Sequence, residues 1–386
     1  MINQRADAVT TPYVFWTEND IKHRALWRSE AGFLPPTKIQ SIDASCSADK
    51  AFGQICQGIA LLWRGDYHHA RQMLVALDRR LGRKRLKASG SITERFHQHR
   101  MKQAQRAITL GRLLVPVNAG HQIELKRAPD VQQACTEVYG SCDDPYLISL
   151  RELLGVIGAH EWRKKGVWVD ALDAFIYPHY GVFSPVRGEY LKLLAQAPLP
   201  EAVLKQDAQA FDIGTGTGVL AAILAKRGIS RIIATDCDKR ALACATENID
   251  RLGLAGQIDV QCQNLFPSGR ATLIVCNPPW LPGKPSSSLE GAIYDPESKM
   301  LESYLAGLKS HLDVNGEAWL ILSNLAVLLG LRSETDLFEH IDKAGLHILE
   351  RHEERPHHKR AQDQSDPLHE ARSRELTTLF RLAMRG

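Results

Sequence analysis

The chain has 386 residues, of which 44% are hydrophobic and 24% charged. This balance is ordinary for a soluble globular protein with a sizeable core, and it excludes a chain too polar to fold. The length is enough for two domains, and the formal net charge of +4 is too small to indicate a partner by itself.

The eight cysteines include no Cys-x-x-Cys pair, and several lie inside apolar runs. This pattern disfavours a disulfide framework and a zinc site built on paired cysteines, so no metal is expected. The N-terminus lacks the basic-then-apolar pattern of a signal peptide. The longest apolar stretch, residues 318–331, is too short to span a bilayer. We therefore expect a cytoplasmic protein without a membrane partner.

Residues 1–160 have mostly helical patterns. In the segment 47–85, apolar residues recur at helical spacing and are interrupted at Gly65 and Asp66, which predicts two helices joined by a turn. The sequence thus predicts a mainly helical N-terminal domain over 1–160, which we expect to recognise the substrate.

Short β-favouring runs broken by Gly, Pro and Asp predict a hairpin-like linker over residues 161–180. A third region, 181–386, then alternates between strand and helix patterns. Strands are predicted at 208–214, 231–236, 258–264, 271–277, 317–323, 346–352 and 376–383. Helices are predicted at 218–228, 239–253, 298–312 and 333–345.

Strands that alternate with helices form parallel β-α-β units with right-handed crossovers. The fold class predicted for residues 181–386 is therefore α/β, with a doubly wound, mostly parallel seven-stranded sheet. The last two strands, with no predicted helix between them, suggest an antiparallel edge pair. Ligands of such sheets bind beyond the carboxyl ends of the strands.

A glycine-rich turn stands where the first of these strands meets the first helix, with Gly214, Gly216 and Gly218 in the run DIGTGTG. Glycines at this point let the backbone approach a ligand at a helix N-terminus. A dinucleotide site normally has the pattern G-x-G-x-x-G, and its last glycine is replaced here by Val219. The turn therefore indicates a nucleotide-like ligand other than NAD or FAD.

Polar residues end the second and third strands. Asp236 is placed to accept hydrogen bonds from two ribose hydroxyls, although it could instead cap the following helix, a role that Asp238 could also fill. Asn264 could bind an adenine edge, with Leu265 or Phe266 packed on the ring. The alternative for Asn264 is an ordinary turn residue.

The fourth strand ends in the sequence Asn277-Pro278-Pro279-Trp280, and two prolines in succession cannot continue a ladder of strand hydrogen bonds. The side-chain oxygen of Asn277 and the carbonyl of Pro278 can accept both N–H groups of a planar nitrogen. The prolines stiffen this arrangement, and Trp280 can stack on a flat target group. These four residues are the predicted catalytic residues. The alternative is a rigid turn that buries a tryptophan.

Together, the runs DIGTGTG, TD, QNLF and NPPW resemble the class I S-adenosylmethionine-dependent methyltransferases of the N-methylating branch, of the methyltransferase small domain type. The resemblance covers residue 175 to the C-terminus and implies S-adenosylmethionine as the cofactor. It implies that the glycine turn faces the methionine part, which Asp212 helps to anchor, and that Asp236 holds the ribose. Asn264 stands where the family usually has an aspartate that contacts adenine.

The segment 179–194 resembles the segment before the glycine strand in release-factor glutamine methyltransferases and in ribosomal-RNA guanine methyltransferases. The resemblance implies that it covers the cofactor, with Phe183, Pro185 and Arg187 as candidate contacts. It lacks the P-R-P-E-T-E form of the glutamine branch. The alternative is a loop that joins two domains.

Two segments bear on the substrate. The segment Arg79–Arg112 holds eleven Lys and Arg residues and one acid, Glu94. It is predicted to bind RNA phosphates with release of counterions, or else to be a solvated helix face. A histidine-rich stretch at 352–369 is interpreted as a solvated loop in preference to a metal site.

The main hypothesis is methyl transfer to an exocyclic amine of an RNA base, in ribosomal or transfer RNA. The alternative is transfer to a glutamine or asparagine amide of a protein, as in the release-factor branch. DNA adenine is a third target class, which is less favoured because no separate base-reading module is apparent. A methyltransferase-like scaffold that binds RNA without catalysis is the non-enzymatic alternative.

Overall fold

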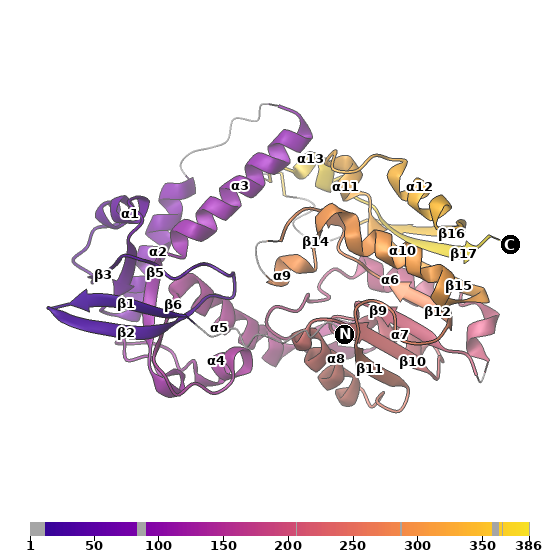
Figure 1. The fold of residues 1–386 in the computed structure, drawn as a ribbon, viewed down its shortest axis with the longest axis horizontal. Coiled ribbons are helices and arrows are strands. Elements are labelled where there is room, and N and C mark those ends of the chain that lie inside the picture. Colours follow the sequence, from indigo (N-terminus) through magenta and orange to yellow (C-terminus); the bar gives the residue numbers. More distant parts are fainter. Residues whose placement is uncertain are drawn as a thin grey trace, which may run out of the picture. The chain divides into compact units, whose positions relative to one another are not determined.

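The computed structural model describes residues 12–82, 90–205, 207–285, 288–356, 363–364 and 366–385 (Figure 1). The chain divides into two compact units. The first comprises Met1–Lys87 and Arg100–His160, and the second comprises Ala88–His99 and Glu161–Gly386. Helices α3 (Ile92–Leu110) and α5 (Leu150–Lys165) each contribute residues to both units.

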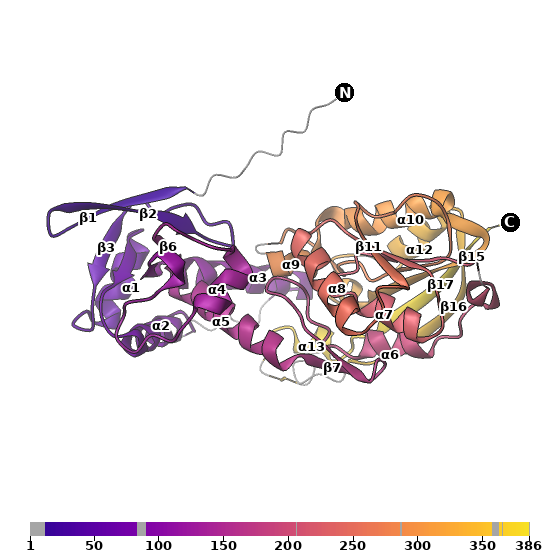
Figure 2. The same cartoon turned by 90° about the horizontal axis from the view of Figure 1, so that it is seen from below.

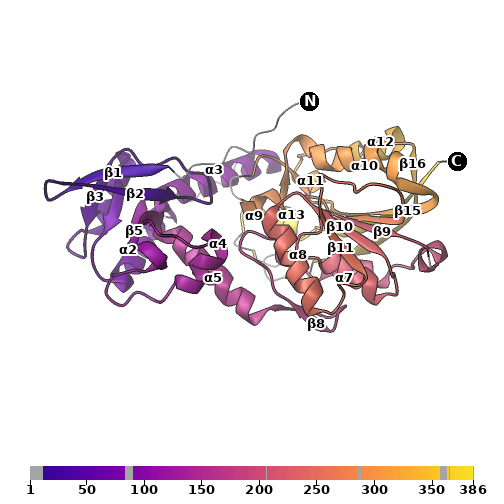
Figure 3. The ribbon, with the colours of Figure 1, turned by 60° about the horizontal axis from the view of Figure 1, so that its bottom comes forward.

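The first unit is built around a six-stranded mixed sheet, part of which is labelled in Figure 3. The order of its strands is β1-β2-β6-β5-β4-β3. Its strands are β1 (Tyr13–Glu18), β2 (Ile21–Arg28), β3 (Ile39–Ile42), β4 (Ala60–Trp63), β5 (Leu113–Val117) and β6 (Tyr146–Ser149). Its other helices are α1 (Ala48–Cys56), α2 (Tyr67–Gly82), the short η1 (Ala119–His121) and α4 (Gln132–Tyr139).

The prediction of a mainly helical N-terminal domain is wrong in missing this sheet. The predicted pair of helices over 47–85 has a strand between them, because β4 separates α1 from α2. All four residues of β4 and all four of β6 are buried. A short apolar run that is buried on both sides has no alternation, so its periodicity does not distinguish it from a helix.

The β1–β2 hairpin shows the opposite pattern, because its side chains alternate between a buried and an exposed face. Val14 and Ala25, which pair across the two strands, lie in a buried cluster with Trp27. Phe15 and Arg24 form the next pair and are exposed. One face of this edge hairpin is therefore open to solvent within the first unit.

The second unit contains a seven-stranded sheet with the order β11-β10-β9-β12-β15-β17-β16. The strands are β9 (Ala210–Ile213), β10 (Ile232–Asp236), β11 (Ile258–Cys262), β12 (Ala271–Cys276), β15 (Leu312–Ser323), β16 (Leu346–Glu354) and β17 (Thr377–Met384). The pairs from β11 to β15 are parallel, and β17 is antiparallel to both β15 and β16. The predicted doubly wound, mostly parallel α/β sheet with an antiparallel pair at its end is confirmed.

Helices cover both faces of this sheet (Figure 2). The principal ones are α6 (Glu189–Gln196), α7 (Val219–Lys226), α8 (Lys239–Arg251), α10 (Lys299–His311) and α12 (Asp336–Lys343). Leu273 and Val275 of β12 pack with residues of α6 and α7, whereas Ile274 and Cys276 pack with α10. This alternation along a fully buried strand is the one expected for a sheet between two helical layers.

Shorter elements complete the unit. They are β7 (Val167–Val169), β8 (Ala174–Ile176), η2 (Glu201–Leu204), β13 (Leu281–Pro282), α9 (Ser288–Gly291), β14 (Tyr294–Asp295), η3 (Pro296–Ser298), α11 (Leu325–Leu328) and α13 (His369–Arg372). Strands β7 and β8 pair antiparallel, so the hairpin predicted within 161–180 is present. No helix of the described residues is long and apolar enough to cross a membrane.

Candidate active site

Apart from the candidate contacts of the segment 179–194, the predicted site residues lie at or just after the ends of four adjacent parallel strands, at the same edge of the sheet. β9 lies between β10 and β12, and Ile213 of β9 pairs with Thr235 and with Cys276. The chain runs outward from β9 to β11 on one side and then returns to form β12 on the other. The carboxyl edge between β9 and β12 is thus the switch point of the sheet, where ligands of doubly wound folds bind.

Asp212 lies on β9 and is fully buried. One carboxylate oxygen, Oδ2, accepts hydrogen bonds from Thr215 Oγ1 at 2.6 Å and from the backbone N–H of Ala221 at 3.1 Å. The other, Oδ1, is buried and has no hydrogen-bond partner among the described residues. Burial raises the pKa of Asp212 to about 6, and the two hydrogen bonds oppose that rise.

The three glycines of the turn all have positive φ, at 73° for Gly214, 57° for Gly216 and 80° for Gly218. A Cβ at Gly216 would meet no atom within 4 Å, whereas one at Gly218 would press on Ala245 of α8 at 3.3 Å. Gly218 therefore allows close packing of α7 and α8, and Gly216 leaves open space beside the backbone.

Asp236 ends β10 and turns toward the glycines. Its Oδ2 accepts a hydrogen bond from the N–H of Gly216 at 3.0 Å, and its Oδ1 accepts one from the N–H of Asp238 at 2.9 Å. The N-cap of α8 is Asp238, whose side chain accepts from the N–H of Arg240. Asp236 is thus not the helix cap, and burial raises its pKa.

The residues after β11 have different surroundings. Asn264 is exposed, and Leu265 has a left-handed φ of 70° and accepts a hydrogen bond from Thr235 Oγ1 at 2.6 Å. Phe266 stacks against His311 and Tyr304, with ring centroids 4.6 and 5.8 Å away. Phe266 therefore packs against α10, and Leu265 is fixed by its backbone.

The Asn277-Pro278-Pro279-Trp280 turn leaves β12 and enters the short strand β13. The backbone N–H of Leu281 bonds the carbonyl of Ile293 at 3.0 Å, which ties the end of the turn to the segment before β14. Trp280 Nε1 donates a hydrogen bond to Asn277 Oδ1 at 2.8 Å. The carboxamide oxygen of Asn277 is thereby oriented by the ring three residues later.

Arg187 lies over this ring, with its guanidinium carbon 4.8 Å from the Trp280 centroid. It donates to Glu189 Oε1 at 2.6 Å and to Glu375 Oε1 at 3.0 Å. Both carboxylates are buried, at 5% and 1% exposure, so the arginine has little freedom to move. Arg187 therefore contacts the NPPW turn and the two acids beside it. Phe183, another candidate contact in this segment, is partly buried.

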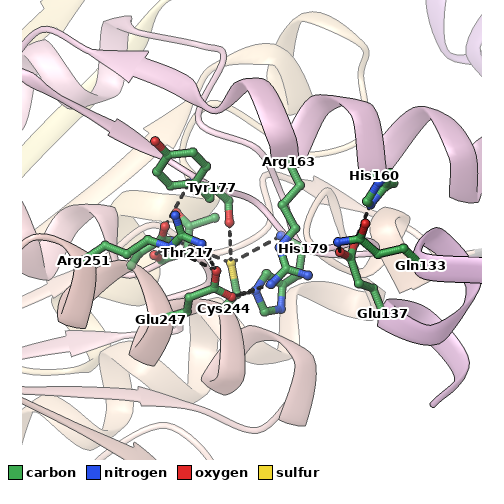
Figure 4. A network of polar contacts seen from close by, with 11 residues as sticks. Gln133, Glu137, His160, Arg163, Tyr177, His179, Thr217, Cys244, Glu247 and Arg251 are labelled. Carbon is green, nitrogen blue, oxygen red and sulfur yellow. Dashed lines mark hydrogen bonds and ion pairs between the residues drawn. The ribbon is translucent and has the colours of Figure 1, made fainter. Parts of the chain in front are cut away.

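The segment before the glycine strand is held on α8 (Figure 4). The N–H of Tyr177 donates to Asn248 Oδ1 at 2.8 Å, and Asn248 Nδ2 donates to the carbonyl of Thr217 at 3.0 Å. Glu247 forms ion pairs with Arg163 at 2.5 Å and with His179 at 2.7 Å. α8 therefore fixes both the glycine turn and the start of the segment that the resemblance places over the cofactor.

Sequence reasoning missed Asn248, Glu247, Glu189 and Glu375. Asn248 and Glu247 stand in a helix whose other polar residues suggest a solvated face, yet Asn248 is 1% exposed. Glu375 lies 188 residues from its partner Arg187. It stands in the polar run 369–375 ahead of β17, so nothing in the local sequence distinguishes it from a solvated acid.

Several of the cations in the basic segment Arg79–Arg112 form ion pairs with acids from outside the segment. Arg80 pairs with Asp49, Arg95 with Glu370 and Arg106 with Asp78. The cations Arg83, Lys84, Arg85 and Lys87 lie outside the described residues.

In the histidine-rich stretch, His357 and His358 are likewise outside the described residues. Within the part of the chain that is described, no three His, Cys, Asp or Glu side chains form a metal-binding group.

The residues at the switch point fit S-adenosylmethionine. A buried carboxylate oxygen on Asp212 has no partner, as expected where a ligand supplies the missing donor. The backbone beside Gly216 has open space, and Asp236 at the next strand end carries a carboxylate beside it.

Comparison with known proteins agrees with this fit. The family described as ribosomal protein L11 methyltransferase (PrmA) matches residues 196–278. This segment includes Asp212, the glycine turn, Asp236 and Asn277. The ribosomal protein L11 methyltransferase of Pelotomaculum thermopropionicum is 40% identical over 81 residues, which are 20% of this chain and 26% of that protein.

Two further relatives belong to branches with other named substrates. The release factor glutamine methyltransferase of Cereibacter sphaeroides is 38% identical over 112 residues, or 28% of this chain and 38% of that protein. The tRNA1(Val) (adenine(37)-N6)-methyltransferase of Bacteroides fragilis is 34% identical over 122 residues, or 29% of this chain and 51% of that protein. The chain thus spans about a quarter to a half of these relatives. The resemblance to methyltransferases is confirmed.

Proposed function

We propose that this protein is an S-adenosylmethionine-dependent N-methyltransferase that methylates an exocyclic amine of an RNA base. The observation that carries the proposal is the place of the Asn277-Pro278-Pro279-Trp280 turn. It leaves β12 next to β9, whose glycine turn and Asp212 form the nucleotide side of the same edge. An acceptor for N–H groups and a cofactor site thus meet at the switch point.

In this proposal, Asp212, Gly214, Gly216 and Gly218 bind the methionine part of the cofactor and Asp236 binds the ribose hydroxyls. Asn264 and Leu265, together with Phe183 of the covering segment, lie around the adenine. When bound, S-adenosylmethionine supplies a methyl group on a sulfonium, which is a strong electrophile. Oδ1 of Asp212 is the buried atom ready to accept a hydrogen bond from the cofactor's ammonium.

The chain's own contribution to the reaction is orientation. An exocyclic amine is a weak nucleophile because its lone pair is delocalised into the ring. Asn277 Oδ1 and the Pro278 carbonyl accept its two hydrogens, so the lone pair points toward the methyl group, and Pro279 keeps the two acceptors rigid. No strong base is required, since the nitrogen becomes acidic once it is methylated.

An RNA substrate is supported by the tRNA-modifying relative and by the open face of the β1–β2 hairpin. Phe15 is 68% exposed and Tyr13 is 43% exposed on this face. Lys22 and Arg24 lie on the same face, and Arg24 is 5.4 Å from the Tyr13 ring. Exposed rings beside cations suit unpaired bases and their phosphates. We therefore assign substrate recognition to residues 1–160, which include the Arg79–Arg112 segment. Catalysis is assigned to residues 181–386.

A protein amide is the second candidate, and one observation favours it. The release factor glutamine methyltransferase matches the chain at 38% identity over 112 residues. The planar amide nitrogen of glutamine would meet the same two acceptors.

Labelling separates the two candidates. The purified chain, with tritiated-methyl S-adenosylmethionine, is incubated with a lysate of cells that lack it, and RNA, DNA and protein are then separated. We expect the label in RNA, and label confined to protein would make the amide the substrate. If no fraction is labelled while titration calorimetry shows no cofactor binding at millimolar concentration, the chain is not an enzyme of this class.

The pKa of Asp212 makes cofactor binding pH-dependent. Because burial raises this pKa to about 6, the carboxylate is protonated at lower pH and loses its attraction for a cationic ligand. We expect affinity for S-adenosylmethionine, measured by titration calorimetry, to fall as the pH drops below about 6.

Protonation of Asp212 affects the stability of the fold in the opposite direction to its effect on cofactor affinity. The folded pKa exceeds the ordinary value of 3.8, so in the cofactor-free chain this group lowers the free energy of unfolding as the pH rises from 3.8 to about 6. In the Asp212→Asn variant, the side chain keeps its size and shape but does not titrate. This variant should bind S-adenosylmethionine more weakly than the wild type, and its affinity should vary less with pH. A wild-type affinity that is constant across pH 6 would contradict this role.

A further inference from the structure

The indole of Trp280 is held in one orientation by contacts on several sides. Its Nε1 donates to Asn277 Oδ1 at 2.8 Å, and its ring packs against the apolar clusters on both faces of the sheet. An indole has a donor and no acceptor, so only the oxygen of the carboxamide can face it. The contact therefore selects one of the two orientations of the Asn277 amide.

Arg187 and two buried acids complete this arrangement, which we call the Trp280 clamp (Trp280, Arg187, Glu189 and Glu375). Glu375 Oε1 accepts hydrogen bonds from Arg187 Nη2 at 3.0 Å and from Ser323 Oγ at 2.7 Å. Glu189 Oε1 accepts from Arg187 Nε at 2.6 Å. The guanidinium is thus fixed at both ends above the ring.

The clamp is joined to the strands on one side of the NPPW turn. Ser323 ends β15, the neighbour of β12, and pairs with Thr377 at the start of β17. In the strand order β9-β12-β15-β17, these residues are on the opposite side of β12 from the glycine turn. Glu375, which accepts from Ser323, therefore joins the clamp to the β15–β17 side of β12 and not to the side of the glycine turn.

The charges of the clamp argue against a phosphate as its ligand. One guanidinium faces two carboxylates, which leaves no net positive charge for an anion. A cation that is paired twice and lies on a ring is suited to holding that ring in place.

We propose that Trp280 is a positioning residue, whose indole N–H sets the orientation of the Asn277 amide, and that Arg187, held by Glu189 and Glu375, fixes the indole. This inference rests on the proposed function. The amide oxygen has two lone pairs and can accept from the indole and from the target nitrogen at once. Without the indole N–H, the Asn277 amide can rotate and present its NH₂ group to the target nitrogen. The NH₂ group is a donor and cannot accept a hydrogen bond from the N–H groups of the target.

The role of the indole N–H can be tested by substituting Trp280 in two proteins, one with the native Asn277 and one with Asn277→Asp. Trp280→Phe keeps a ring and removes the donor, and we expect kcat to fall about tenfold, as for the loss of one hydrogen bond, with KM and cofactor affinity little changed. An aspartate has an oxygen at both positions, so in an Asn277→Asp background the same substitution should change kcat by less than about threefold. Equal losses in both backgrounds, or no loss with Asn277 present, would overturn the inference.

A second readout does not depend on turnover. In the full-length ¹⁵N-labelled chain, the indole N–H signal of Trp280 is identified by its absence in Trp280→Phe. We expect its exchange with water to become at least about tenfold faster in Asn277→Ala and in Arg187→Met, and to be partly restored in Arg187→Lys. Arg351→Met is the matched control, since Arg351 lies 4.7 Å from the Phe338 ring away from the turn.

These results distinguish the inference from the function on which it rests. A wild-type chain that binds no cofactor and labels no fraction contradicts the proposed function, whatever the indole signal does. An indole signal that is the same in Asn277→Ala, Arg187→Met and the wild type overturns the clamp, even if the chain transfers methyl groups.

Discussion

Replacing Asn277 with alanine is expected to lower kcat for methyl transfer by about 10²–10³-fold, while S-adenosylmethionine still binds. The variant loses the side-chain acceptor for one hydrogen of the target nitrogen, and the other acceptor, the Pro278 carbonyl, is a backbone atom that remains. Asp212, the glycine turn and Asp236 are untouched, so calorimetry should give a wild-type affinity for the cofactor.

The control for this variant is Asn277→Asp, which keeps an acceptor oxygen and should retain more activity than alanine does. Methyl transfer by Asn277→Ala at the wild-type rate would remove Asn277 from the mechanism. A parallel loss of cofactor binding would show instead that the substitution has disturbed the neighbouring strand end.

The second large effect is expected for Asp236→Ala, which should weaken S-adenosylmethionine binding by about 100-fold or more. In the proposed binding mode, Asp236 accepts two charge-assisted hydrogen bonds from the ribose, each contributing about 1.5–3 kcal/mol, and both are lost in this variant. The N–H groups of Gly216 and Asp238 also lose their acceptor. Calorimetric titration of the purified variant measures the change.

Asp238→Ala is the matched control, because this residue lies two positions away and caps α8. Its loss should destabilise the fold by about 1 kcal/mol without changing cofactor affinity. If the two variants bind the cofactor equally well, Asp236 does not hold the ribose.

Much of the catalytic unit could be predicted from sequence because its signals are local. Alternating strand and helix patterns predicted the seven strands of its main sheet, and the four motifs stand at the ends of four adjacent strands of that sheet. Parallel pairing then brings Asp212, Asp236 and Asn277 to one edge without any further information.

The parts that could not be predicted depend on contacts distant in sequence or on burial. The strand β4 is a four-residue apolar run between two helices, and only its neighbours β3 and β5 make it a strand. Arg187 is a candidate cofactor contact in the sequence, but nothing there indicates that its carboxylate partner Glu375 lies 188 residues later. The orientation of Trp280 toward Asn277 depends on the side-chain rotamer and on packing, and the NPPW motif does not predict either of them.

The basic segment shows a related limit. Its composition suggested a large positive surface, but Arg80, Arg95 and Arg106 are paired with acids that stand outside the segment. The exposed rings and cations of the β1–β2 hairpin therefore support an RNA substrate more strongly than the basic segment does. Replacing Phe15 and Arg24 is accordingly the informative change for substrate binding.

In the proposed mechanism, the NPPW turn directs methyl transfer to a planar nitrogen. The most direct test uses S-adenosylmethionine with a deuterated methyl group, followed by digestion of the labelled RNA to nucleosides and mass spectrometry with fragmentation of each base. We predict a deuterated methyl group on an exocyclic amine with the wild-type chain, and its loss with Asn277→Ala. A methyl group on a ring carbon or on a ribose oxygen would contradict the claim.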